Sequence, residues 1–251
     1  MRKAPENTAF APVGGTGASE AIVRRVGELI GSGELRPGDR LPPEVELADS
    51  FQVAPMTVRT ALQVLRENHL IETRRGRGGG TFVRTGAVDA PYFRDAELPS
   101  VEEFEDFTVW RMAVSGEACA RLAERFATGE IADADRQRLL DLTDASHRSD
   151  VSVETFRLAD ADLHRFMAQL SGSARLLEAE RSIQAYLTRT LRHLAKPVDT
   201  ASLSGQAHSA LVAAIVAGHA AAAREELKTH VRSTLDLMVG VGYLGSHREP
   251  E

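Results

Sequence analysis

The sequence predicts a mainly α-helical protein of two domains: a small domain of helices and one hairpin, then a larger domain of helices alone. Three observations predict this fold class. The chain has 251 residues, which exceeds one average domain. Alanine, leucine, valine and arginine are frequent while aromatic residues make up 5%, a composition that favours helices. Finally, two short β-forming runs enclose a glycine-rich segment near residue 78, and every segment from about residue 101 onward has helical spacing.

Prolines, glycines and breaks in periodicity predict where these domains begin and end. Residues 1–17 contain Pro5, Pro12 and several glycines without a periodic pattern, and residues 86–100 contain Pro91 and Pro99. We therefore expect a flexible N-terminal arm over 1–17, a first domain over 18–85, a linker over 86–100, a helical domain over 101–245 and a tail over 246–251. The helical domain is expected to be an antiparallel bundle of six or seven helices.

Composition excludes several classes of protein. A single cysteine, Cys119, cannot form an internal disulfide framework and suits a reducing compartment. The longest apolar stretch, 210–223, is interrupted by His219 and is too short to span a bilayer. No charged-then-apolar leader is evident at the start of the chain. We therefore expect a cytoplasmic protein without a membrane partner.

Charge is distributed unevenly along the chain. The whole chain has a net charge of −6, but residues 1–85 contain 12 basic and 10 acidic residues. Within 59–84 there are six arginines and only two acidic residues. A local basic surface of this kind is what contact with nucleic-acid phosphates requires. An arginine-rich face can also be merely solvated, so this observation alone leaves both interpretations open.

The first domain contains a pattern of helix, tight turn, helix and hairpin. After a helix that we expect to be capped by Ser19, Pro43 is placed to start a second helix, and Pro55 starts a third after a short connection. The third helix has its apolar residues at i, i+3, i+4 and i+7, beginning with Val58. Runs at 70–73 and 81–84 then flank the glycines. This layout is typical of a winged helix-turn-helix, which places one helix in the DNA major groove and a loop beside it.

The residues expected to contact DNA lie at the start of the third helix and in the hairpin tip. Thr57 and Arg59 are donors near the N-terminal end of the helix, where base edges and phosphates are met first. Arg75 and Arg77 could enter a narrow minor groove or bind phosphates, and Gly76 permits close approach. Arg40 is a weaker candidate. Taken singly, Thr57 and Arg59 have plain structural explanations, as a first-turn residue and an exposed charge.

The helical domain contains residues that suit a metal ion. Asp160 and His164 are four residues apart and share one helix face, while His208 and His230 lie in the last two expected helices. A bundle could bring these residues together as three imidazoles and one carboxylate, leaving coordination positions free for a ligand. From spacing alone, each histidine could equally be a surface or core-capping residue.

The first domain resembles the GntR family of bacterial transcription regulators. The resemblance covers residues 18–85 and consists of Gly33-x-Leu35-x-Pro37-Gly38-Asp39-x-Leu41-Pro42-Pro43-Glu44-x-x-Leu47-Ala48, Thr57-Val58-Arg59-x-Ala61-Leu62-x-x-Leu65 and Gly76-Arg77-Gly78-Gly79. It implies a dimer that binds a double-stranded DNA operator with an inverted repeat. This chain departs from the family pattern at Val45, Gln52 and Pro55, where Arg, Gly and Arg are common, so the operator sequence is left open.

The second domain resembles the FCD effector domain of the FadR-type branch. The resemblance covers residues 101–243 and consists of Arg111 with Glu117, Asp160-x-x-x-His164, Ser171-Gly172, His208 and His230. It implies that Asp160, His164, His208 and His230 bind a divalent metal, for which we expect zinc, with nickel, iron or manganese as alternatives. It also implies a small carboxylate effector with an arginine as counter-charge. Arg111 is our candidate, and a surface salt bridge with Glu117 or a neighbouring residue is the alternative.

Together these observations predict a ligand-responsive DNA-binding regulator rather than an enzyme. Two other hypotheses are left open. The helical domain could bind a larger acyl thioester without metal, as some FadR-type proteins do. The Asp/His set could also activate water in a metal-dependent hydrolase, but no additional general base has convincing spacing and the DNA-binding domain would be unexplained.

Overall fold

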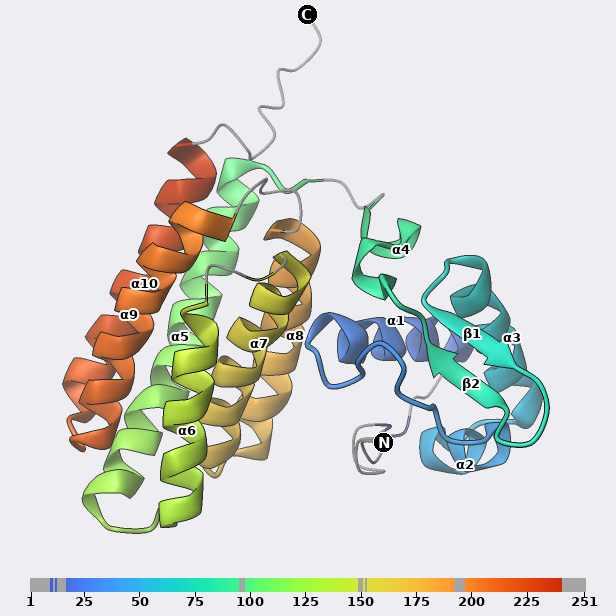
Figure 1. Cartoon of the computed structure of the whole chain (residues 1–251), viewed down its shortest axis with the longest axis horizontal. Coiled ribbons are helices and arrows are strands. Elements are labelled where there is room, and N and C mark those ends of the chain that lie inside the picture. The colour runs from blue at the N-terminus through green and yellow to red at the C-terminus, as the bar shows by residue number, and fades with distance from the viewer. Residues whose placement is uncertain are drawn as a thin grey trace, which may run out of the picture. The chain divides into compact units, whose positions relative to one another are not determined.

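The computed structural model describes residues 10, 12, 17–94, 98–148, 151, 153–191 and 197–240. It divides near residue 96 into two compact units, which are described separately below. The fold is mainly α-helical with one two-stranded sheet, as the sequence predicts (Figure 1). Most of the expected arm over 1–17 and all of the expected tail over 246–251 lie outside the described residues. No helix in the described part of the chain is long and apolar enough to cross a membrane.

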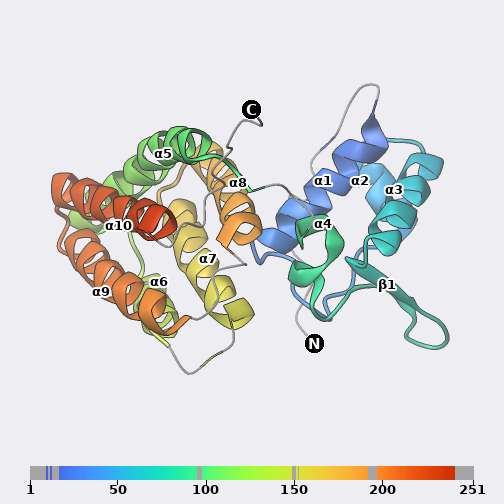
Figure 2. The ribbon, with the colours of Figure 1, turned by 90° about the horizontal axis from the view of Figure 1, so that it is seen from above.

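The first unit contains three helices and a hairpin. The helices are α1 (Ala18–Gly31), α2 (Glu44–Phe51) and α3 (Pro55–Glu67), and the strands are β1 (Ile71–Arg74) and β2 (Gly80–Val83). The strands are antiparallel and pair Ile71 with Val83 and Arg74 with Gly80. The tip of the hairpin projects beyond α3 in Figure 2. This is the winged helix-turn-helix that the sequence predicts.

Apolar side chains hold the first unit together. Helix α3 buries Val58, Ala61, Leu62 and Leu65, the four residues that its periodicity predicts. Phe10 is also buried and meets Phe51 edge-on, with 5.7 Å between the ring centroids. The expected cap of α1 is wrong: the helix begins at Ala18 after Gly17, so Ser19 lies inside the first turn. Gly17 has φ of 97°, a left-handed conformation that glycine adopts without strain.

The segment expected to be a linker has structure of its own at its start. A 3-10 helix, η2 (Ala87–Asp89), and a short helix, α4 (Pro91–Arg94), follow the hairpin. Val88, Ala90 and Phe93 are buried in the apolar core of the first unit. Three apolar residues in a short stretch do not give a periodic pattern, which is why the sequence did not reveal this packing.

The second unit is a bundle of long helices. They are α5 (Val101–Ala127), α6 (Asp133–Ser146), α7 (Val153–Leu170), α8 (Ala174–Leu191), α9 (Pro197–Val216) and α10 (Ala220–Gly240). A capping box begins α5, because Ser100 accepts from the Glu103 amide while Glu103 accepts from the Ser100 amide. Helix α10 packs against α5 and α9, and α6 packs against α7 and α9. These helices lie side by side in Figure 1, and α5, α6, α7, α9 and α10 contribute buried side chains to one apolar core.

Candidate nucleic-acid interface and metal centre

The recognition helix α3 separates its buried and exposed faces clearly. It begins at Pro55, whose missing N–H would have no helical partner at that position. Thr57 is half-buried, whereas the side chain of Arg59 is 61% exposed. Both lie within the first turn and a half, where a helix inserted in the major groove meets the bases. The structure thus presents Arg59 fully and Thr57 partly on this surface.

An ion pair connects α3 to the start of α2. Nε of Arg59 donates to Oε2 of Glu44 over 2.8 Å, and both side chains are substantially exposed. An exposed pair of this kind contributes little to stability, at most about 1 kcal/mol. The ion pair instead holds the Arg59 guanidinium in one orientation, near the N-terminal ends of α2 and α3.

The tip of the hairpin has a backbone that depends on glycine. Gly76 and Gly78 have φ of 97° and 91°, and a Cβ at Gly79 would lie 2.5 Å from the carbonyl oxygen of Arg74. The amide of Gly79 donates to the carbonyl of Gly76 over 2.8 Å, which closes the turn. Arg75 and Arg77 are exposed on this turn. A thin tip with two exposed guanidinium groups can approach a nucleic-acid groove or its phosphates.

Arg40 lies beside strand β2 of the hairpin. It forms an isolated bridge with Phe82, next to the β2 strand. Gly80 has φ of 153°, and a Cβ there would lie 2.6 Å from Nε of Arg40, so a larger residue would have to displace the guanidinium. The six sequence-predicted DNA contacts are therefore all on the first unit, five of them exposed and Thr57 half-buried.

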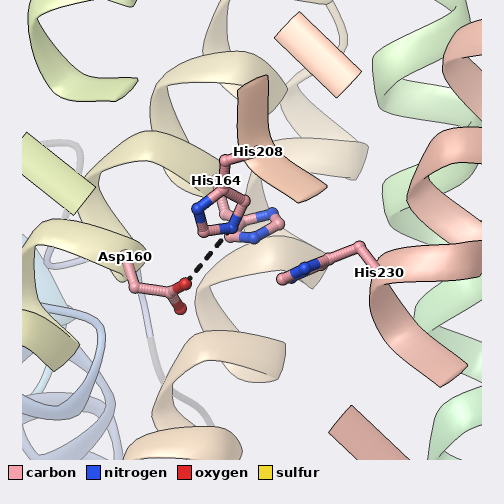
Figure 3. A group of neighbouring side chains, drawn as sticks. All are labelled: Asp160, His164, His208 and His230. Atoms are coloured by element: carbon pink, nitrogen blue, oxygen red, sulfur yellow. Dashed lines mark ion pairs between the residues drawn. The ribbon is translucent and has the colours of Figure 1, made fainter. Parts of the chain in front are cut away.

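In the second unit the structure brings Asp160, His164, His208 and His230 together. Asp160 and His164 come from α7, His208 from α9 and His230 from α10 (Figure 3). All four side chains are buried, and one potential ligand atom from each lies within 4.8 Å of the others. The three imidazole rings are close neighbours, with His208 and His230 centroids 4.5 Å apart. Three nitrogens and one oxygen at this separation suit a divalent transition metal.

Burial sets the protonation state that metal binding needs. It lowers the pKa of His208 to about 4, although Asp160 opposes this shift, and it holds the pKa values of His164 and His230 well below the ordinary value. Burial alone would raise the pKa of Asp160, but Arg157 and the neighbouring side chains hold it below the ordinary value. At neutral pH the cluster therefore contains neutral imidazoles and a carboxylate, which are the forms that bind metals.

The hydrogen bonds around His208 leave two acceptors facing each other. The hydroxyl of Ser146 donates to the carbonyl of Thr143 over 2.7 Å, so its oxygen accepts from Nδ1 of His208 at 3.1 Å. This assigns the proton of the neutral ring to Nδ1 and a lone pair to Nε2. Nε2 lies 3.4 Å from Oδ1 of Asp160 and has no hydrogen-bond partner in the part of the chain that the structure describes. Two buried acceptors that face one another are unfavourable unless a cation lies between them, so these residues fit a bound metal.

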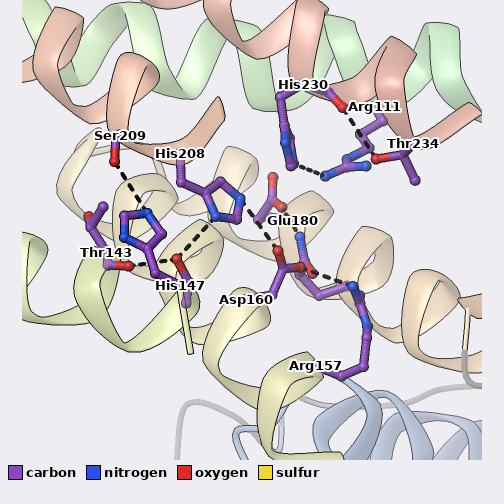
Figure 4. Close-up of polar contacts among 12 residues, drawn as sticks. Arg111, Thr143, His147, Arg157, Asp160, Glu180, His208, Ser209, His230 and Thr234 are labelled. Atoms are coloured by element: carbon purple, nitrogen blue, oxygen red, sulfur yellow. Dashed lines mark hydrogen bonds and ion pairs between the residues drawn. The ribbon is translucent and has the colours of Figure 1, made fainter. Parts of the chain in front are cut away.

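Arg111, the expected partner of an anionic effector, borders this cluster. It is 2% exposed, and one terminal nitrogen donates to Nε2 of His230 over 3.2 Å (Figure 4). The alternative interpretation of Arg111, a surface salt bridge with Glu117, is wrong. Arg111 is buried, and Glu117 pairs with Arg224. Burial lowers the pKa of Arg111 from its ordinary value, with Asp160 and Glu180 opposing the shift. Its Nε has no hydrogen-bond partner among the described residues.

Several other buried polar residues were missed from the sequence. Arg157 donates to Oδ2 of Asp160 over 3.2 Å, while its Nε and its other terminal nitrogen have no hydrogen-bond partner within the described residues. Glu180 accepts from Ser115 at 2.7 Å and from Gln184 at 2.7 Å, and burial raises its pKa. A signal was available for Arg157, which lies three residues before Asp160 on the same helix face. Glu180 and Ser115 are single polar residues in amphipathic patterns, and nothing in the sequence distinguishes them from exposed ones.

The remaining described histidines lie outside the cluster. His69 contacts Arg84, His147 contacts Ser209, and His219 is exposed just before α10. His193 and His247 lie outside the described residues. The exposure of His219 fits a residue at a helix start that faces solvent.

A winged helix-turn-helix joined to a helical domain with a buried Asp/His3 cluster defines a class of DNA-binding transcription regulators. Residues 18–83 match the model described as "Bacterial regulatory proteins, gntR family", and residues 106–233 match the FCD domain. The chain belongs to the GntR family, in the branch that has an FCD domain.

Individual relatives agree with this assignment. The chain is 32% identical to the "Putative HTH-type transcriptional regulator RmpR" of Mycobacterium gastri, over 91% of this chain and 84% of that protein. It is 27% identical to the "Putative L-lactate dehydrogenase operon regulatory protein" of Escherichia coli K12, over 85% and 83%. The solved structure of E. coli McbR/YncC has the same fold, with a TM-score of 0.55 at 14% identity, over 91% and 100%. The relatives are transcription regulators and not enzymes.

Proposed function

We propose that this chain is a cytoplasmic, ligand-responsive regulator that binds an inverted-repeat operator as a homodimer. A small carboxylate bound at a metal in the FCD domain would change the affinity for the operator. Such a change requires the effector to favour one arrangement of the two DNA-binding units by differential affinity. The buried Asp160/His164/His208/His230 cluster is the observation that supports the metal-dependent form of this proposal.

The proposed operator contacts are Arg40, Thr57, Arg59, Arg75, Gly76 and Arg77. Arg59 is the strongest of them, because its fork of donors can bind a guanine edge bidentately or a phosphate. Arg75 and Arg77 would add phosphate or minor-groove contacts that depend on salt. The exposure of these three arginines supports their role.

The proposed metal ligands are Asp160, His164, His208 and His230. Zinc suits three imidazoles and one carboxylate, and nickel, iron or manganese are alternatives. When bound, the metal would supply a Lewis-acidic position at which a carboxylate oxygen can bind. Ser146 would hold His208 in the tautomer that presents Nε2, in the way that outer residues usually orient a metal-bound histidine.

Arg111 and Arg157 are proposed to bind the effector's anionic group. Both are buried, and both retain donor atoms without a hydrogen-bond partner among the described residues. Buried guanidinium donors of this kind are costly unless an anion pairs with them. L-lactate is a reasonable first probe, since its carboxylate and adjacent hydroxyl can both bind a metal and one relative is named after an L-lactate dehydrogenase operon.

Two experiments test this proposal. Protein purified without chelator should contain about one divalent metal ion per chain by elemental analysis, as four ligands in one cluster require. In the second experiment, genomic fragments bound by the protein at moderate salt should include one that binds far more tightly than bulk DNA. Absence of metal would favour an acyl thioester as effector, and absence of any preferred fragment would contradict specific operator binding.

A further inference from the structure

Two exposed apolar side chains stand out in the first unit. Val45 is 66% exposed and Met56 is 65% exposed, and they are the most exposed large hydrophobic residues in the described part of the chain. The others lie in the helical domain, from Val101 onward. Within the described residues of the first unit, large apolar exposure is therefore confined to these two positions.

Both side chains lie on the surface proposed to meet DNA. Val45 is the second residue of α2 and Met56 is the second residue of α3. Met56 precedes Arg59 by three residues and so shares its helix face. Val45 follows Glu44, whose carboxylate accepts from Arg59 over 2.8 Å. Val45 and Met56 are thus close in sequence to the Glu44–Arg59 ion pair, at the N-terminal ends of α2 and α3.

The chemistry of the pair restricts what it can bind on DNA. Neither an isopropyl group nor a thioether chain can donate to a phosphate oxygen or to a base edge. The apolar group that the major groove offers is the C5-methyl of thymine, which no other standard base has. A helix N-terminus inserted in that groove brings its first residues to the base edges.

We propose that Met56 and Val45 contact thymine C5-methyl groups and so select thymine next to the base pair that Arg59 contacts. This inference rests on the proposed operator-binding surface and adds a specificity determinant to it. A second protein or a second copy of this chain would be the other occupant of an exposed apolar pair. Continuity with Arg59 and Thr57 favours DNA.

The size of the effect follows from apolar burial. Removing one methyl group from water is worth about 0.8 kcal/mol, which corresponds to roughly fourfold in affinity. An operator with two half-sites should therefore lose about 15-fold when one contacted methyl is removed from each. The loss should not depend on salt, unlike the loss of a phosphate contact.

The test uses the full-length protein and deoxyuridine. Operator sequences are first selected from a random pool by the wild-type protein. Thymines at enriched positions are then replaced one at a time by deoxyuridine, which removes the methyl and leaves every hydrogen-bonding group in place. We expect about a fourfold loss per contacted methyl in a fluorescence anisotropy titration. Met56→Ala or Val45→Ala should bind the thymine and deoxyuridine operators with equal affinity at the corresponding position, while Met56→Leu should keep the discrimination.

Leu140→Ala is the matched control, because it truncates an exposed apolar side chain of the helical domain. It should discriminate thymine from deoxyuridine as wild type does. Equal binding of thymine and deoxyuridine operators by the wild-type protein would overturn the inference, as would selected operators without enriched thymine. Either result would leave tight, sequence-selective binding intact and so would be distinct from failure of the proposed function. Self-association that Met56→Ala abolishes, without any methyl effect, would assign the pair to a protein contact instead.

Discussion

The two units use polar side chains in opposite ways. The proposed DNA contacts of the first unit lie on its surface, around an apolar core. The second unit buries its proposed metal ligands, with Asp160, His164, His208 and His230 all at most 4% exposed. Exposed polar side chains stay hydrated and change the stability of the folded state little. Their contribution to binding arises only when they contact DNA. A buried polar site destabilises the fold until a metal or ligand balances it, which couples occupancy to the conformation of the domain.

The largest expected effect comes from removing a ligand of the buried cluster. His208→Ala should weaken Zn²⁺ binding by more than about 100-fold, since even outer residues of metal sites contribute 10- to 100-fold. Isothermal titration calorimetry with zinc measures the loss, and Asp160→Asn should reproduce it with less change in packing. His219→Ala is the matched control, because His219 is an exposed histidine outside the cluster. Unchanged zinc affinity in both His208→Ala and Asp160→Asn would show that the cluster does not bind metal.

A mutation on the exposed surface of the first unit should weaken DNA binding and leave zinc binding unchanged. Arg59→Ala should weaken binding to a selected operator by at least about 10-fold, because a good arginine–base contact contributes about 1–3 kcal/mol and a dimer on an inverted repeat loses two of them. Zinc affinity and thermal stability should stay the same. Arg121→Ala removes an exposed arginine from α5 and serves as the control for charge. If Arg121→Ala weakened binding as much, general electrostatic attraction would replace a specific contact as the explanation.

Glu180→Gln tests whether the polar interior destabilises the second unit. Burial raises the pKa of Glu180, so the native state holds the proton more tightly than the unfolded chain does. The Glu180 carboxyl group therefore lowers the free energy of unfolding as the pH rises above the ordinary pKa of glutamate. This loss of stability disappears when the solution is acidified below that pKa. Glutamine is neutral; its amide oxygen can still accept from Gln184, and its NH2 group can donate to the hydroxyl oxygen of Ser115.

We expect Glu180→Gln to raise the melting temperature at pH 7, with a difference from wild type that shrinks as pH falls toward the ordinary glutamate pKa. Thermal unfolding at several pH values measures this difference. Glu20→Gln, on the exposed first turn of α1, should have no such effect. A constant difference across the pH range would mean that Glu180 does not titrate as burial predicts.

The smallest expected effect concerns the turn between α2 and α3. Gln52 has φ of 55°, a left-handed conformation that costs a non-glycine residue about 1–2 kcal/mol. Gln52→Gly should remove this strain, partly offset by the greater entropy of glycine in the unfolded chain, for a net gain of up to about 1 kcal/mol. Chemical denaturation measures it. Gln63→Gly in the middle of α3 should instead destabilise the protein by about 1 kcal/mol.

The sequence could predict the elements whose residues repeat at a fixed period. The face of α3 and the glycines of the hairpin followed from local pattern, and Gln52 occupies a turn position where the family often has glycine. Asp160, His164, His208 and His230 come together only if α7, α9 and α10 pack with these residues at the same level. The spacing of the residues in the sequence could not predict that packing. Arg157 and Glu180 were missed because burial of a single polar residue depends on neighbours far away in sequence.

We propose that a carboxylate bound at the buried cluster changes the affinity of the exposed surface for DNA. The most direct test is a titration of operator binding with zinc present, with and without L-lactate or another small carboxylate that the protein binds. For wild type we predict a shift in operator Kd of about 5- to 150-fold, the usual range of allosteric coupling. Asp160→Asn should bind the operator without effector as wild type does and show no shift. An equal shift in Asp160→Asn would contradict the account, because the effector would then act without the metal cluster.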